Sequence, residues 1–357
     1  MADAELDARA AEAERSVSTL FGGRLLGIPG THLARVEHPP RGRADAHWNY
    51  WWQAHYLDCL VDAGRRALRL GDVTCAAERA RRGDRLLATI RLRNVGRFPN
   101  AFYDDMAWLV LASGRLAVLQ AELGRARPGR RLRTSERVLT AQLRSAVTDD
   151  LGGGAFWSTT RDFKNVPASG PVALHLARIG DGTAARSLVE WMYARLLDPD
   201  SGLFLDGVRL VDGEEVVVRD VWTYNQGTVL GALVTLGDAQ SLTRAVQLVA
   251  AVQRGLTVGD RGALVTHGGH DGGLFTGILA RYLALAATDP AVDPETADAA
   301  RRLVTATAEG FWAGRASTVD ATRFPVDAVE PAPSEGRLEL STQLQAWMTL
   351  EAAAACG

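Results

Sequence analysis

Apolar residues recur at intervals of three and four positions along most of the chain, a period typical of amphipathic helices. The pattern predicts twelve helices joined by segments rich in glycine, proline and polar residues. One region departs from this pattern, because β-branched runs on both sides of Asp212-Gly213 predict a β-hairpin near 208–218. The predicted helices span about 3–20, 47–70, 74–92, 101–122, 131–148, 166–179, 182–197, 223–236, 239–256, 271–286, 293–311 and 340–353.

The connections between these helices alternate in length. Even-numbered helices end in short links such as Gly71-Asp72, Gly180-Asp181 and Gly237-Asp238, and glycine is favoured just after a helix C-terminus. Long connections precede the second, sixth, eighth and twelfth helices, and long excursions in a compact domain are usually functional. This alternation predicts an all-α fold, an (α/α)6 barrel formed by residues 1–357 as a single domain. The even-numbered helices line its inside, with every long loop at one rim. The long connections span about 21–46, 149–165, 198–222 and 312–339.

Polar and aromatic residues gather near the N-termini of the even-numbered helices. The odd-numbered helices instead carry charged faces such as Ala80-Arg-Arg-Gly-Asp-Arg85, which are typical of solvated surfaces. Because the predicted ring brings the even-numbered N-termini together, we expect one rim to hold a functional cleft. The clusters are 47–55, 100–108, 152–157 with 162–165, 222–227, 268–275 and 339–347.

Composition and charge narrow the class of protein. The net charge of −2 provides no basic footprint for nucleic acid or an acidic membrane surface. No apolar run approaches the ~20 residues of a membrane span, and the acidic N-terminus lacks the apolar core of a signal peptide. Three scattered cysteines are too few for a disulfide frame. We therefore expect a cytoplasmic protein with no nucleic-acid partner and no membrane span, whose oligomeric state the sequence leaves open.

Adjacent aspartates, Asp104 and Asp105, lie at the predicted start of the fourth helix. Such a pair is usually a capping or solvated feature, but here Tyr103, Met106 and Trp108 surround it with large apolar side chains. Neighbouring side chains that diverge bring their carboxyl groups to ~5–5.5 Å, the separation that retaining glycosidases use for a nucleophile and an acid/base. A charged neighbour also raises the proton affinity of the second carboxyl group. We predict that this pair is catalytic.

Aromatic faces next to amides and carboxylates suit sugar rings, because C–H faces stack on aromatic rings and hydroxyl groups need directed partners. A tryptophan at a helix start is more often part of the core, yet the four residues of this run, Trp48, Trp51, Trp52 and His55, occupy more than one helical face. At least one should therefore reach the cavity. The predicted substrate-binding residues are Trp51, Trp52, Gln53, His55, Asn100, Tyr103, Trp157, Lys164, Asn165, Tyr224, Asn225, Gln226, Asp271 and Phe275.

Lys164 is the only lysine in a chain whose basic residues are otherwise arginine, so we expect it to have a functional or a buried structural role. His267 and His270 flank Gly-Gly on a loop, but no third ligand is evident, so no metal site is predicted. Gly152-Gly-Gly154 lacks the strand and the Lys-Ser/Thr of a phosphate loop. We expect no cofactor.

With these motifs assembled, the sequence resembles glycoside hydrolase family 76, the endo-α-1,6-mannanases. The resemblance extends over about residues 47–350, and its motifs are specific in order and spacing rather than singly. It implies an (α/α)6 barrel and retaining hydrolysis of α-1,6-linked mannose, with α-mannan or mannooligosaccharide as substrate. It also implies that Asp104 is the nucleophile and Asp105 the acid/base. The matching motifs are Tyr-Trp-Trp-Gln-Ala-His (50–55), Tyr-Asp-Asp-Met-Ala-Trp (103–108), Asp-Phe-Lys-Asn (162–165), Trp-Thr-Tyr-Asn-Gln-Gly (222–227) and Asp-Gly-Gly-Leu-Phe (271–275) with Gly277.

Two other functions remain open from the residues alone. An epimerase could use the same barrel, since fold does not decide chemistry, and would draw on His55, His267 and His270. A glycan-binding protein without activity could keep the aromatic cluster. Many members of the resembled family are secreted, so a chain without a signal peptide implies either an intracellular mannoside or another export route.

Overall fold

The computed structural model of the chain describes residues 2–41, 48–319 and 321–357. Twelve α-helices lie within these residues, and their ends fall within three residues of the predicted ones. The predicted start of the second helix at His47 lies outside the described residues. The helices are α1 (Ala2–Leu20), α2 (Tyr50–Arg69), α3 (Val73–Arg93), α4 (Tyr103–Glu122), α5 (Arg130–Ala146), α6 (Val166–Arg178), α7 (Gly182–Leu196), α8 (Thr223–Leu236), α9 (Ala239–Gly255), α10 (Gly272–Thr288), α11 (Pro294–Ala313) and α12 (Leu340–Cys356).

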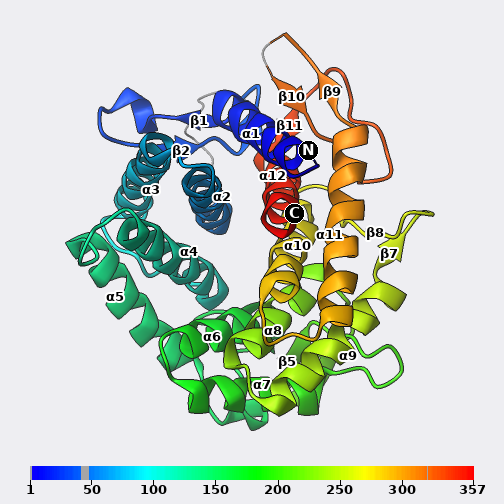
Figure 1. Cartoon of the computed structure of the whole chain (residues 1–357). Coiled ribbons are helices and arrows are strands. Elements are labelled where there is room, and N and C mark those ends of the chain that lie inside the picture. The colour runs from blue at the N-terminus through cyan, green and yellow to red at the C-terminus, as the bar shows by residue number, and fades with distance from the viewer. Residues whose placement is uncertain (1, 42–47, 320) are drawn as a thin grey trace.

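The even-numbered helices form a closed inner ring, in which each contacts the next and α12 contacts α2 (Figure 1). The odd-numbered helices lie outside it, and each of α3, α5, α7, α9 and α11 packs on the inner helix before it. Helix α1 packs on α12, so the two chain ends lie side by side (Figure 1). The predicted (α/α)6 barrel is therefore confirmed.

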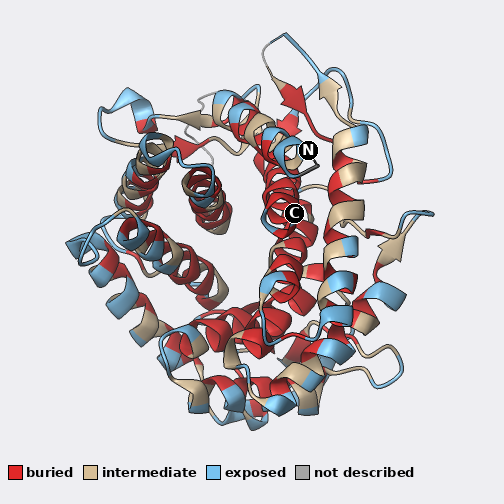
Figure 2. Cartoon of the chain, viewed as in Figure 1, coloured by how far each residue is buried: buried red, intermediate tan, exposed pale blue. Residues whose placement is uncertain are grey.

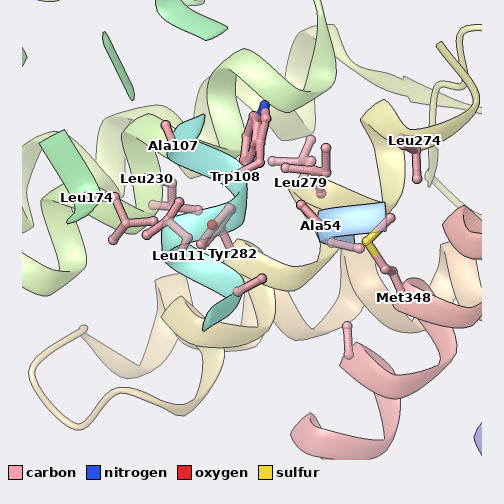
Figure 3. Packing of buried hydrophobic residues seen from close by; sticks show 14 of the residues in the cluster. Ala54, Ala107, Trp108, Leu111, Leu174, Leu230, Leu274, Leu279, Tyr282 and Met348 are labelled. Atoms are coloured by element: carbon pink, nitrogen blue, oxygen red, sulfur yellow. The ribbon is translucent and has the colours of Figure 1, made fainter. Parts of the chain in front are cut away.

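The inner helices owe their position to their composition. Nearly every residue of α8, α10 and α12 is buried, whereas the outer helices expose the face that points away from the ring (Figure 2). Side chains from several inner helices, including Ala54, Trp108, Leu230 and Met348, pack into one core (Figure 3). Glycine permits close approach: a Cβ atom on Gly227 would lie 2.9 Å from the Cα atom of Leu279.

A small antiparallel sheet stands at the rim, in the order β4-β5-β6. The predicted hairpin is confirmed as β5 (Gly207–Val211) and β6 (Glu214–Val218), and both turn residues, Asp212 and Gly213, have positive φ. Strand β4 (Phe163–Asn165) pairs with β5 and was not predicted, because three residues carry no periodicity. The other short elements are β1 (Gly22–Gly23), η1 (Leu25–Gly27), β2 (Leu33–Ala34), β3 (Glu37–His38), η2 (Asp150–Gly152), β7 (Thr257–Val258), β8 (Ala263–Leu264), β9 (Ala316–Ser317), β10 (Thr322–Arg323) and β11 (Leu338–Glu339).

Among the described residues, no helix combines the length and the apolar character needed to cross a membrane.

Candidate active site

A cavity of about 370 Å³ opens among the N-termini of the inner helices, at the rim predicted from the loop lengths. Three carboxylates and a wall of aromatic rings surround it. This combination is typical of sites that take polar ligands with apolar faces. Its lining consists of Trp48, Asn49, Tyr50, Trp51, Phe102, Asp104, Asp105, Trp108, Trp157, Tyr224, Asp271 and Phe275.

The backbone of the loop around Trp157 holds Asp104 in place. The amide of Tyr103 donates to the carbonyl of Trp157 at 2.8 Å, and the amide of Thr159 donates to the carbonyl of Ala101 at 2.9 Å. These bonds tie the loop to the start of α4, so that Trp157 Nε1 donates to Asp104 Oδ2 at 2.9 Å. The backbone amide of Asp105 donates to Asp104 Oδ1, also at 2.9 Å. Each oxygen of Asp104 therefore accepts one N–H bond, which favours its ionised form.

Asp105 has a different environment. Asn100 Nδ2 donates to its Oδ2 at 2.5 Å, and the Oδ1 of Asn100 accepts from the amide of Phe102. Asp105 Oδ1 has no hydrogen-bond partner among the described residues, while the side chain lines the cavity. That oxygen is therefore free to carry a proton toward a bound molecule.

The two carboxyl groups differ in how readily they ionise. Burial raises the pKa of Asp104 above its ordinary value, and its N–H bonds to Trp157 and to the Asp105 amide oppose this rise. Burial and then the charge of Asp104 raise the pKa of Asp105 further, with Asp271 adding to both. The pair therefore holds its proton on Asp105 and its negative charge on Asp104, as a nucleophile and a general acid require.

Aromatic rings form the wall beside the carboxylates. Trp108 lies one helical turn after Asp104, so both side chains share a face of α4. Its ring is stacked with that of Tyr224, with 6.4 Å between the ring centroids. The rings of Tyr224 and Phe275 are also stacked, with centroids 3.8 Å apart and an interplanar angle of 1°. Trp51 lies 6.5 Å from Trp108. The wall therefore presents several apolar surfaces suitable for sugar rings.

Asp271, just before α10, is the third carboxylate of the cavity. Its Oδ1 accepts hydrogen bonds from the indole N–H groups of Trp51 (3.0 Å) and Trp52 (2.8 Å), and from Asn49 at 3.4 Å. Trp52 does not line the cavity itself but fixes a group that does. Three donors on one oxygen leave Oδ2 available to a ligand.

Several predicted substrate-binding residues do not line the cavity, because they hold loops in place. The side-chain amide of Gln53 donates to the carbonyl of Ala34 and accepts from its backbone amide, with both hydrogen bonds 2.9 Å long. The side-chain amide of Gln226 makes the same two bonds with the backbone of Phe204, also at 2.9 Å. Asn165 accepts from the amide of Ala168 as the N-cap of α6. Asn225 is fully buried and donates to Asp206 at 3.3 Å. Asn100 donates to Asp105, and the backbone amide of Tyr103 donates to the carbonyl of Trp157, so both position the site without lining the cavity.

Lys164 is fully buried beneath the rim. Its Nζ donates to the carbonyl oxygens of Thr148 (2.7 Å), Asp150 (2.7 Å) and Gly153 (2.9 Å), and to the Thr148 hydroxyl at 2.9 Å. The buried structural role foreseen for the only lysine is therefore the one observed, and the ammonium group does not reach the cavity.

None of the three histidines on which an epimerase would depend lines this cavity. His55 is buried against Trp51 and Trp108. His267 Nε2 accepts from the amide of Thr223, and burial lowers its pKa to about 4. His270 is exposed and pairs with Glu339. Among the described residues, no three His, Cys, Asp or Glu side chains are arranged to hold a metal ion.

Five lining residues were absent from the predicted set: Trp48, Asn49, Tyr50, Phe102 and Trp108. Trp108 follows Asp104 by four positions, and helical spacing could have identified it. Phe102 could not have been found in this way, because its place depends on pairing with the loop at Ser158.

Comparison with known proteins places these observations in context. The model of Glycosyl hydrolase family 76 matches residues 6–355. The α-1,6-mannanase GH76A from Salegentibacter sp. HEL1_6 is 28% identical, with a TM-score of 0.83 over 99% of this chain and 100% of that one. An inactive variant of that enzyme, with two consecutive aspartates replaced by asparagine, has been solved with α-1,6-mannotriose (28% identity, TM-score 0.84, coverage 99% and 100%).

A more distant structure, the family 76 mannosidase Bt3792 from Bacteroides thetaiotaomicron, shares the fold (18% identity, TM-score 0.76, coverage 99% and 98%). No curated protein matches the sequence.

Proposed function

Because the chain belongs to glycosyl hydrolase family 76, we propose that it cleaves α-1,6-linked mannose chains and retains the configuration at the anomeric carbon. The observation that carries this proposal is the Asp104-Asp105 pair in the aromatic cavity. The related mannanase is inactive when two consecutive aspartates are replaced. This chain also has a second consecutive pair, Asp149-Asp150, but that pair does not line the cavity and its backbone holds Lys164.

The reaction proposed is a double displacement. Asp104, ionised and oriented by Trp157, attacks the anomeric carbon while Asp105 gives its proton to the departing glycosidic oxygen. Asp105 then removes a proton from water, and the resulting hydroxide displaces Asp104 and regenerates the free enzyme. Asp105 moves both protons and Asp104 supplies the nucleophile, so this mechanism requires neither a metal nor a cofactor.

The substrate proposed is α-mannan or a mannooligosaccharide. The stacked rings of Trp108, Tyr224 and Phe275 offer apolar faces to sugar C–H groups, and Asp271 offers an oxygen to a hydroxyl group. We also propose that residues 1–357 act as one catalytic domain. Its support is the packing of α1 on α12, which joins both ends of the chain to the ring.

Asp104→Asn and Asp105→Asn test the assignment with α-1,6-mannotetraose and product analysis by chromatography. Each should lower the rate by roughly a hundredfold or more, because each removes one half of the acid–nucleophile pair. Asp162→Asn is the matched control, since Asp162 is a rim carboxylate that pairs with Arg209 outside the cavity. Rates within a few-fold of wild type in both cavity variants would disprove the proposal.

Azide separates the two roles. With an activated aryl α-mannoside, Asp105→Ala still forms the glycosyl-enzyme, and azide then releases an α-mannosyl azide. Asp104→Gly leaves room for azide to attack the sugar directly, which gives the β-mannosyl azide. The opposite pattern of products would exchange the two assignments.

A further inference from the structure

A second, larger cavity lies at the other end of the barrel, among the C-terminal halves of α2, α4 and α6 and the start of α5. Its volume is about 480 Å³, against about 370 Å³ at the catalytic rim. A smaller cavity of about 180 Å³ adjoins it and shares Arg65, Arg115 and Arg178 with it. We call the larger one the floor cavity; the lining residues used below are Val110, Arg115, Val118, Leu132, Arg178 and Ile179.

Most positive charges around the floor cavity are already paired. Arg115 contacts both Asp58 and Asp62, which Arg281 also contacts at 3.2 and 2.7 Å. Arg65 pairs with Glu122 at 2.8 Å. These ion pairs leave little net charge on the wall.

Arg178 is different. It belongs to the last turn of α6, borders both cavities, and has no hydrogen-bond or ion-pair partner among the residues that the structure describes. It is an exposed residue of the cavity lining, so a ligand can reach its guanidinium. Burial lowers the pKa of the neighbouring His175 to about 4, so at neutral pH that ring is uncharged. Arg178 is therefore the one arginine of the lining that makes no ion pair with a described residue.

The rest of the cavity is apolar. Val110 and Leu132 form its buried wall. Val118 and Ile179 leave 49% and 40% of their surface exposed at its edge. Apolar side chains left uncovered beside an unpaired cation are the features of a site for a ligand with a charged head and an apolar body.

The alternative is that Arg178 only stabilises the negative C-terminal end of its helix. That role does not explain the cavity or the exposed apolar side chains at its edge. Glu136 also borders the cavity, from the exposed face of α5, but makes no ion pair with Arg178 among the described residues.

We propose that the floor cavity binds an amphiphilic anion, with a single carboxylate or phosphate-monoester head on the Arg178 guanidinium and an apolar chain against Val118, Leu132 and Ile179. A planar guanidinium matches both head groups, because each presents two oxygens to its N–H donors. This binding function is separate from the proposed hydrolysis, and neither depends on the other.

Calorimetric titration of the full chain with octanoate, octyl phosphate, octanol and inorganic phosphate tests the proposal. At least one of the two amphiphilic anions should bind with 1:1 stoichiometry, and the tighter one identifies the head group. Octanol lacks the charged head group and inorganic phosphate lacks the apolar chain, so each should bind at least about tenfold more weakly. The absence of saturable binding by both amphiphilic anions would overturn the proposal.

Two variants locate the site, with a third as control. Arg178→Met should weaken binding of the amphiphilic anion by at least about tenfold. Val118→Ser, at an already exposed position, should weaken it by roughly threefold without changing the affinity for inorganic phosphate. Arg137→Met removes an exposed arginine of α5 that does not line the cavity, and should bind like wild type. Unchanged affinity in Arg178→Met would refute the proposal.

Discussion

Replacing Asp104 by asparagine should stabilise the protein at alkaline pH while it inactivates the site. Desolvation raises the pKa of Asp104 from 3.8 to about 7 in the folded chain. A carboxyl group whose pKa is higher in the folded state favours folding while it is protonated. That advantage is lost as the pH rises through the folded-state pKa, because an ionised group must then be held in a poorly solvated site.

The magnitude follows from the shift. About three pKa units correspond to about 4 kcal/mol at full effect, and solvent in the cavity reduces this to roughly 1–3 kcal/mol for a partly buried group. An uncharged asparagine avoids that cost. For a chain of 357 residues this free energy corresponds to an increase in Tm of about 1–4 °C at pH 8.5. At pH 5 the carboxyl group is protonated in the folded chain but largely ionised in the unfolded chain, so less than half of the difference should remain, and it should vanish only below pH 3.8.

Differential scanning calorimetry of wild type and Asp104→Asn at pH 5 and pH 8.5 measures this effect. Asp162→Asn is the control with the opposite sign, because hydrogen bonding to Thr160 and the charge of Arg209 lower the pKa of Asp162. Its replacement should not raise the Tm at either pH. An Asp104→Asn variant that is no more stable than wild type at pH 8.5, or equally stabilised at both pH values, would refute the reasoning.

Three further predictions concern the same rim. The value of kcat/KM should rise with pH through about 7 as Asp104 ionises and fall at higher pH as Asp105 loses its proton; a flat profile from pH 5 to 9 would contradict the assignment. Trp157→Phe removes an N–H bond to the ionised Asp104, so kcat/KM should fall about tenfold and the acidic limb of its pH profile should move to higher pH. An acidic limb at the same pH as in wild type would exclude that role. Lys164→Met leaves four oxygen acceptors without their donor, so it should lower the free energy of unfolding, measured with urea, by roughly 3 kcal/mol or more. A loss below about 1 kcal/mol would show that the ammonium group is dispensable.

The sequence predicted the barrel well because its evidence was spread over the whole chain. Twelve periodic segments and the alternation of loop lengths agree with each other, so an error in one boundary leaves the arrangement unchanged. The position of Asp104 followed from the same reasoning, since the N-termini of the inner helices all lie at the rim.

Individual side chains were harder to assign, for a physical reason. Gln53 and Gln226 lie in the first turns of inner helices, as a sugar-binding amide would, yet both bind the backbone of a rim loop. Sequence cannot distinguish the two roles, because a buried loop carbonyl and a sugar hydroxyl need the same donor. Lys164 illustrates the opposite case, in which scarcity alone indicated importance and the structure supplied the role.

The most direct test of the central claim is NMR spectroscopy during hydrolysis of α-1,6-mannotetraose by the wild-type protein. The Asp104–Asp105 mechanism predicts that α-1,6 bonds are cleaved and that the newly formed reducing end appears first as the α-anomer, before mutarotation. First appearance of the β-anomer would show inversion and would contradict the double displacement.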